Sequence, residues 1–185
     1  MVTIVDADPG WAAEFERIRS QLGDALGSTA LGIEHIGSTS VPGLPSKDVI
    51  DVQVAVADED AFERVSAALT AKGWRRPPGV WSDHPVTGFS VDDSQWRKVF
   101  FDEPAGTRLV HVHVRVAGRA NARYALLFRD FLRTHPDEAA AYAELKRRLA
   151  AIAPDSGTYA DTKDPACDLV YLAAERWASE TNWGS

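Results

Sequence analysis

The sequence predicts an α+β protein in which helices flank a mixed β-sheet and the last third of the chain is helical. Through residue 118, short apolar runs with two-residue alternation are interspersed with amphipathic helical patterns. After Gly118 three helical patterns follow one another with no strand between them. The chain has no internal repeat. We therefore expect a single domain over residues 1–185, with an α/β core over 1–118 and a helical extension over 119–185.

The composition is that of a chain that folds by itself. Of its 185 residues, 45% are hydrophobic and 25% are charged, far from the composition of disordered proteins. The net charge of −7 argues against an extended nucleic-acid-binding surface, because such surfaces are rich in Lys and Arg. The single cysteine, Cys167, excludes an internal disulfide. The chain shows neither a secretory signal nor an apolar membrane span, so we expect a cytoplasmic protein, and its oligomeric state stays open.

Each element of the core follows from hydrophobic periodicity and turn residues. Apolar residues at three- and four-residue spacing after Asp8-Pro9-Gly10 predict the first helix, which ends near Gly27. Valine-rich alternation predicts an interior strand after the turn at Gly37-Ser38. The elements expected in the core are a helix over 11–26, strands over 31–36 and 49–56, a helix over 58–73, and a hairpin of strands over 97–102 and 107–116.

Two parts of the chain remain. Residues 74–94 are rich in Pro, Gly and Trp and show no regular period, so we predict an irregular segment there. Its length suits a functional lid or binding loop, and a locally packed surface loop is the alternative. In the C-terminal third, the helices are expected over 120–133, 136–151 and 164–177.

A turn of small residues precedes the second strand. Gly37, Ser38, Thr39 and Ser40 form this turn, and Lys47 follows it. Backbone N–H groups exposed in such a turn attract anions, and a nearby lysine adds a positive charge. We therefore predict that the turn contacts a phosphate group, with Lys47 and Lys163 as candidate partners of that group; a solvated face is the alternative for each lysine.

Alternation puts polar side chains on one face of two predicted strands. Asp51 and Gln53 lie opposite the valines of their strand, and His111, His113 and Arg115 lie opposite the valines of another. We expect the first pair to face a cleft or water. Asp51 is the best candidate for a Mg²⁺ ligand, with Gln53 and His113 beside it, and Arg115 could hold phosphate. A carboxylate that hydrogen-bonds the preceding turn is the alternative for Asp51.

Histidines and a second lysine widen the choice of chemistry. His111 and His113 could bind a transition metal, act as acid and base, or contact phosphate, and a pair of solvated imidazoles is the alternative. Tyr159 and Lys163 are predicted just before the last helix, where an anion could bind. A simple helix cap by Asp161 or Thr162 explains that stretch nearly as well.

A specific run of residues resembles a known family. The run extends from Glu34-His35-Ile36-Gly37-Ser38-Thr39-Ser40-Val41-Pro42-Gly43-Leu44 to Lys47 and Ile50-Asp51-Val52. It continues in His111-Val112-His113-Val114, Phe128-Arg129-Asp130-Phe131-Leu132-Arg133 and Tyr159 to Lys163. This resembles the GrpB family, a domain that is also joined to dephospho-CoA kinase in some bacteria.

The GrpB family in turn looks like a branch of the nucleotidyltransferase superfamily. The resemblance implies a nucleotidyltransferase-like sheet, in which Gly37-Ser38 would cradle a triphosphate and Asp51 would bind Mg²⁺. Two positions depart from the superfamily pattern, because Gln53 replaces the second acidic residue and a histidine, at 111 or 113, replaces the third. These departures put the superfamily's two-metal chemistry in doubt.

Three hypotheses follow. In the first, the protein binds a nucleoside triphosphate with Mg²⁺ and transfers a nucleotidyl group or activates a small substrate, with Asp51, His111 and His113 as catalytic residues. In the second, it is a non-catalytic ligand-binding or folding-accessory module that keeps the pocket without the metal chemistry. In the third, its histidines hold a transition metal for catalysis.

Overall fold

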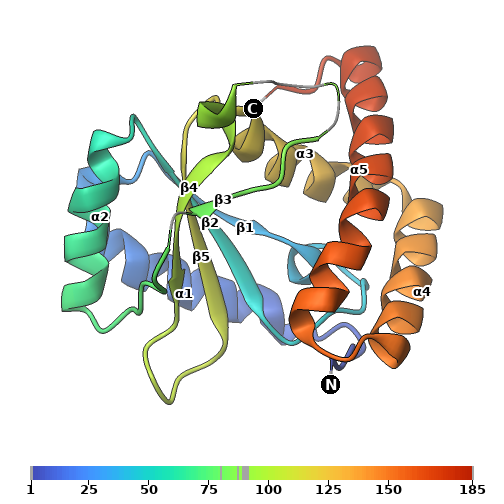
Figure 1. Cartoon of the computed structure of the whole chain (residues 1–185), viewed down its shortest axis with the longest axis horizontal. Helices are drawn as coiled ribbons and strands as arrows, with labels where there is room; N and C mark the ends of the chain where they lie inside the picture. The colour runs from blue at the N-terminus through green and yellow to red at the C-terminus, as the bar shows by residue number, and fades with distance from the viewer. Residues whose placement is uncertain (1, 80, 87, 89–91, 185) are drawn as a thin grey trace.

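The computed structural model describes residues 2–79, 81–86, 88 and 92–184. Within these residues the chain forms five α-helices around a five-stranded sheet (Figure 1). The elements are α1 (Gly10–Leu26), β1 (Gly32–Ile36), β2 (Ile50–Val56), α2 (Asp60–Ala71), β3 (Trp81–Ser82), β4 (Arg97–Asp102), β5 (Val110–Val116), α3 (Ala120–Thr134), α4 (Pro136–Ile152) and α5 (Ser156–Thr181). The predicted α+β class, with a helical C-terminal third, is confirmed.

The described strands form one mixed sheet in the order β1-β2-β5-β4-β3. β2 runs parallel to β5, and the other neighbours are antiparallel. The pairing of β2 with β5 sets Asp51 opposite His111 and Gln53 opposite His113. The two polar runs of the sequence therefore lie side by side on one face of the sheet.

The opposite face of the sheet is apolar and lies against α1 and α2. Every second residue of β2 and β5 is a buried valine or isoleucine, and α1 adds an apolar stripe at helical spacing. Full burial of each such side chain stabilises the fold by about 1.5–3 kcal/mol. The main residues of this core are Trp11, Phe15, Ile18, Leu22, Ile50, Val52, Val54, Val65, Leu69, Phe101, Val112 and Val114.

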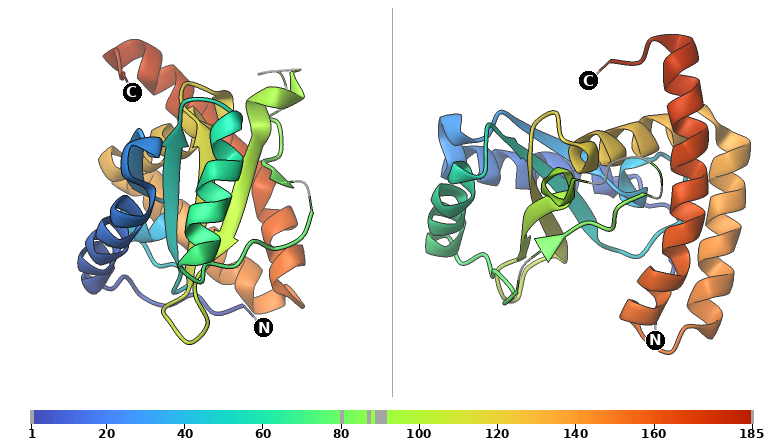
Figure 2. Two further views of the ribbon diagram at one scale, coloured as in Figure 1. Left: turned by 90° about the vertical axis from the view of Figure 1, so that its left-hand side faces the viewer. Right: turned by 45° about the horizontal axis from the view of Figure 1, so that its top comes forward.

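The three C-terminal helices form a layer of their own. α5 packs against α3 and α4, and Figure 2 shows α4 and α5 running side by side. Their core is largely separate from the first and contains Trp96, Leu127, Phe131, Tyr142 and Tyr171. A cavity remains between the polar face of the sheet and this helical layer.

The last helix begins earlier than the sequence predicts. We expected it over 164–177, whereas α5 begins at Ser156 and includes Pro165 in its interior. Asp155 caps it, since its carboxylate accepts a hydrogen bond of 2.8 Å from the backbone N–H of Thr158. A proline inside a helix removes one backbone hydrogen bond, and packing against α3 and α4 supports the helix through it.

The irregular segment 74–94 also contains more structure than expected. Trp81 and Ser82 form the short edge strand β3, and a turn of 3₁₀ helix spans Asp93–Trp96. Two residues are too few to show alternation in a sequence. Residues 80, 87 and 89–91 of the predicted lid or loop lie outside the described residues. The hairpin prediction is confirmed, although β5 begins at Val110 instead of Thr107.

Among the described residues, no helix has both the length and the apolar composition needed to cross a membrane.

Candidate functional site

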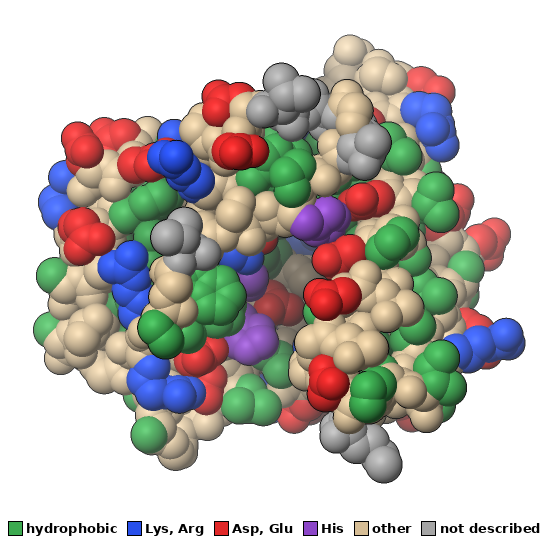
Figure 3. Space-filling view, viewed as in Figure 1, with side chains coloured by type: hydrophobic (Ala, Val, Ile, Leu, Met, Phe, Trp, Pro, Cys, Tyr) green, Lys and Arg blue, Asp and Glu red, His purple; other side chains and the backbone are tan. Residues whose placement is uncertain are grey.

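A cavity of about 610 Å³ lies between the polar face of the sheet and the three C-terminal helices. Figure 3 shows the surface hollowed here, with histidine side chains along the hollow. The turn before β2 contributes Gly37 and Ser38 to the wall, β2 contributes Asp51, and α4 and α5 contribute Lys146 and Lys163. The cavity therefore unites residues that are far apart in the sequence.

Asp51 is held by its neighbours in one orientation. Its Oδ1 lies 3.4 Å from Nδ1 of His111 and 3.7 Å from Nε2 of His113. Although burial opposes ionisation, hydrogen bonds from these two imidazoles hold the pKa of Asp51 below its usual range. Its Oδ2 faces Gly37, where an added Cβ would clash with the carboxylate. Gly37 also has a φ of 68°, so glycine is required on two counts.

His113 serves Asp51 as a hydrogen-bond donor. Its Nδ1 lies 3.2 Å from the Lys98 Nζ, and an ammonium group can only donate. Burial, followed by the charge of Lys98, lowers the pKa of His113 to about 4, so the imidazole is neutral at pH 7. With Nδ1 accepting, the single ring proton lies on Nε2 and points toward Asp51. In this tautomer His113 has no lone pair free for a metal.

One group of side chains has the composition of a metal site. The ligand atoms of Asp51, His111 and His113 all lie within 4.8 Å of one another. One carboxylate and two imidazoles suit a transition metal better than Mg²⁺. However, the Lys98 contact makes Nε2 of His113 a donor, and metal-bound histidines normally donate their other nitrogen to an acceptor. In the described arrangement, Asp51 and His111 are the members of this group that fit a cation.

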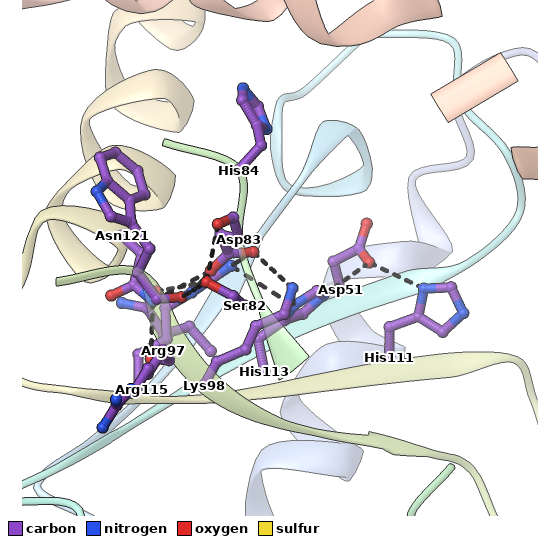
Figure 4. A network of polar contacts seen from close by, with 12 residues as sticks. Asp51, Ser82, Asp83, His84, Arg97, Lys98, His111, His113, Arg115 and Asn121 are labelled. Atoms are coloured by element: carbon purple, nitrogen blue, oxygen red, sulfur yellow. Dashed lines mark hydrogen bonds and ion pairs between the residues drawn. The ribbon is translucent and has the colours of Figure 1, made fainter. Parts of the chain in front are cut away.

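A second carboxylate, Asp83, balances two cations of the sheet (Figure 4). Asp83 lies 2.5 Å from the Lys98 Nζ and accepts a bond of 2.9 Å from Nε of Arg115. The charges of Arg115 and Lys98 outweigh the effect of burial and hold the pKa of Asp83 well below its usual range. Asn121 donates to the same carboxylate at 3.2 Å. Asp83 is thus fully engaged.

The expectation that Gln53 faces a cleft or water is wrong. Its side chain is only 1% exposed. Its Oε1 accepts a bond of 2.8 Å from Nη1 of Arg115, and its Nε2 donates to the carbonyl of Ala122 at 3.3 Å. A polar group can be buried when its hydrogen bonds are made, which alternation alone does not reveal. The same contacts engage Arg115, which was predicted to hold phosphate.

A group of three lysines lies at the other end of the cavity, and we call Lys47, Lys146 and Lys163 the lysine cluster. Lys146, only 2% exposed, donates to the carbonyl of Pro45. Lys163 contacts the Tyr142 hydroxyl at 3.4 Å, and Lys47 lies over the ring of Tyr159, 5.5 Å from its centroid. Among the described residues, none of the three lies within ion-pair distance of a carboxylate.

The lysines of this cluster repel one another. Burial, followed by the charge of Lys163, lowers the pKa of Lys146 to about 7. Burial is also the main cause that lowers the pKa of Lys47, and Lys163 again adds to it. Among the described residues, the cluster therefore concentrates positive charge with no carboxylate in ion-pair distance, and the charge of Asp51 acts on Lys47 and Lys146 only from farther away.

The predicted phosphate turn contributes only part of itself to the cavity. Gly37 and Ser38 line it, and Ser38 hydrogen-bonds Tyr142. Thr39 and Ser40 are buried elsewhere, which corrects the prediction for them. The Thr39 hydroxyl lies 3.0 Å from Nε2 of His35, and the Ser40 hydroxyl donates to the carbonyl of Gly37. These hydroxyls complete the turn instead of facing a ligand.

The residues predicted near the last helix reach the cavity in a different way. Tyr159 and Lys163 lie within α5, so neither the expected helix start nor a cap by Asp161 or Thr162 is found there. Their side chains nevertheless line the cavity. Sequence reasoning missed Asp83, Lys98 and Lys146, because one lies in an irregular segment and the lysines look like ordinary exposed positions.

Fold and site together define a class: an α+β protein with a cavity between its sheet and its C-terminal helices, lined by a carboxylate, histidines, lysines and aromatic side chains. The GrpB protein family model matches residues 1–172. The chain belongs to the GrpB family.

Relatives agree with this assignment. The chain is 35% identical to a dephospho-CoA kinase of Mycobacterium leprae over 97% of this chain and 48% of that protein. It is 39% identical to the UPF0157 protein PA4798 of Pseudomonas aeruginosa, over 88% of this chain and 63% of that protein. The chain thus spans about half the length of the first of these relatives and under two thirds of the second.

Solved structures resemble the chain as well. The crystal structure of the conserved protein GrpB from Enterococcus faecalis matches with a TM-score of 0.75 and 27% identity, covering 95% of this chain and 99% of that one. The Cid1 poly(U) polymerase matches at a TM-score of 0.48 and 12% identity, over 77% of this chain and 41% of that one.

Proposed function

We propose that this protein binds a nucleoside triphosphate, or another small molecule with several phosphate groups, in the cavity between the sheet and the C-terminal helices. The lysine cluster carries this proposal. Burying a charge without a partner is costly, and three neighbouring cations that have no carboxylate in ion-pair distance within the described part of the chain favour a polyanionic ligand. Ser38 and the backbone of the turn lie beside the cluster, where phosphate oxygens can accept hydrogen bonds.

A divalent cation would accompany the phosphates at Asp51. Mg²⁺ is usually held by one or two carboxylates together with substrate phosphates, and Asp51 Oδ2 is the carboxylate oxygen that faces the turn. When bound, the cation would neutralise phosphate charge and polarise the phosphorus that is attacked. The chain itself holds the carboxylate in place through His111 and His113.

Nucleotidyl transfer to a small acceptor, or another activation of that acceptor, is the reaction that this arrangement would support. His111 is the residue best placed as a general base, since Asp51 orients its Nδ1 and the imidazole remains partly exposed. The resemblance of the Gly37-Ser38 turn and Asp51 to the nucleotidyltransferase pattern supports the same proposal.

A second candidate function is a binding module without turnover. It is favoured by one observation: the position where the superfamily pattern has its second carboxylate is Gln53, and that side chain is engaged by Arg115. Such a module would bind the same anions through the lysine cluster and release no product.

Calorimetric titration with ATP, GTP, CTP and UTP, with and without Mg²⁺, separates these cases. We expect binding of at least one nucleotide by the wild type, at least tenfold weaker binding by Lys146→Met, and loss of the Mg²⁺ effect in Asp51→Ala. Lys72→Met, which removes an exposed lysine at the end of α2 that does not line the cavity, is the matched control. If the wild type binds neither a nucleotide nor inorganic tripolyphosphate, the proposal is wrong. A nucleotide-dependent product would exclude the binding-module candidate.

A further inference from the structure

We propose that the site holds one divalent cation, and that the Lys98–Arg115 pair takes the place of a second. This inference rests on the proposed function, since it concerns the cation that accompanies the bound phosphates. Three features of the polar face of the sheet carry it: the engagement of Gln53, the engagement of Asp83, and the single carboxylate oxygen left at Asp51.

No acidic side chain is available at the second position of the strand. Two close cations need carboxylates that bridge or flank them. Two residues after Asp51 the chain has Gln53, whose neutral oxygen already accepts a bond from Arg115. A cation at this position would have to displace a buried guanidinium, which is 5% exposed and cannot lose its charge.

Asp83 does not replace the missing carboxylate. It lies in the same cavity, but its two oxygens bond Lys98, Arg115 and Asn121. Its negative charge is therefore used to hold two positive charges beside the cavity. A metal that took Asp83 as a ligand would leave both cations unpaired and would lie close to them.

The Lys98–Arg115 pair lies where a second cation would act. Lys98 is 3.2 Å and Arg115 is 3.5 Å from Nδ1 of His113, and the opposite nitrogen of this ring faces Asp51. Both cations line the cavity that would hold the phosphates. Fixed ammonium and guanidinium groups can neutralise phosphate charge without any metal, the guanidinium through planar hydrogen bonding.

Asp51 itself offers room for a single cation. Its Oδ1 faces the two imidazoles, and its Oδ2 faces the turn at Gly37. One oxygen directed at the phosphate-binding end of the cavity suits one shared cation between the protein and its ligand.

Counting bound Mn²⁺ tests this inference. The wild-type chain is dialysed to equilibrium with Mn²⁺ and inorganic tripolyphosphate, a probe that needs no knowledge of the base, and bound metal is measured by elemental analysis. We expect one Mn²⁺ per chain at saturation and a marked loss of bound metal in Asp51→Asn. Two Mn²⁺ per wild-type chain would overturn the inference while leaving the proposed function intact.

Substitution of the fixed cations gives a second readout that does not depend on metal counting. Lys98→Met should weaken tripolyphosphate binding at least tenfold in calorimetry, whereas Lys72→Met should leave it unchanged. Lys98→Met keeps Asp83 paired with Arg115, and circular dichroism checks that the variant is folded. Unchanged binding by folded Lys98→Met overturns the inference. If the wild type binds neither tripolyphosphate nor any nucleotide, with or without Mn²⁺, the proposed function fails together with it.

Discussion

The cavity holds two groups of cations that differ in one respect. Lys98 and Arg115, on the sheet, are balanced by Asp83, whereas the lysine cluster on the turn and the helices has no carboxylate partner among the described residues. Both groups line the same space. The cations of the sheet are thus held by a carboxylate of the protein itself, whereas the lysine cluster carries charge that the proposed anionic ligand would neutralise. Removing the carboxylate of the paired group should therefore lower the free energy of unfolding, whereas removing a lysine of the unpaired cluster should raise it.

Removal of Asp83 should have the largest effect. Asp83→Ala leaves two buried cations without a counter-ion, so we expect a loss of about 3–5 kcal/mol in the free energy of unfolding. Urea unfolding monitored by tryptophan fluorescence measures it. Asp6→Ala breaks an exposed pair with Arg147 and should change stability little. Equal effects of the two substitutions would show that Asp83 is not a structural counter-ion.

Gly37 lines the same cavity, beside Asp51. Gly37→Ala should cost about 2–3 kcal/mol, because alanine meets both a positive φ and the Asp51 carboxylate. Gly43→Ala is a matched control, since Gly43 has a φ of 78° but no atom within contact of an added Cβ. Gly43→Ala should therefore lose only the part of the free energy of unfolding that comes from backbone strain at positive φ. If both variants lose the same amount, contact with Asp51 contributes nothing.

Ligand affinity should depend on pH through Lys146. Its pKa is lowered from 10.5 to about 7, so the side chain is charged below pH 7 and loses its charge as the pH rises. An anion prefers the charged form, and we therefore expect about tenfold weaker tripolyphosphate binding at pH 8 than at pH 6. Calorimetry at the two pH values measures the change. Lys146→Arg stays charged, so its affinity for tripolyphosphate should be the same at both pH values. If its affinity also falls at pH 8, another group causes the pH dependence.

The smallest effect is expected for the stability of Lys146→Met without ligand. Replacing a buried, unpaired cation by an apolar side chain of similar length should raise the free energy of unfolding by about 1 kcal/mol. The urea titration used for Asp83→Ala also measures this change. We expect Lys146→Met to be more stable than the wild type and Asp83→Ala to be less stable. A destabilisation of several kcal/mol would instead make Lys146 a structural residue.

Sequence reasoning recovered the fold class and most elements because these depend on local pattern. The alternation in β2 and β5 placed His111, His113 and Asp51 on one face, and the structure brings them together there. Local pattern failed where long-range contacts decide the outcome. Gln53 is buried because Arg115 and the Ala122 carbonyl satisfy it, and α5 continues through Pro165 because neighbouring helices support it.

By itself, the sequence determined the family, the mixed sheet with its helical C-terminal third, and the polar face on which Asp51 lies. Periodicity and turn chemistry are properties of neighbouring residues, so they can be read along the chain. Only the tertiary structure decided which cations are paired. Asp83 pairs with Lys98 and Arg115 from distant segments, and Lys146 feels the charge of Lys163 with no carboxylate in ion-pair distance among the described residues. The charge balance of the cavity, and with it the case for an anionic ligand, depends on those contacts.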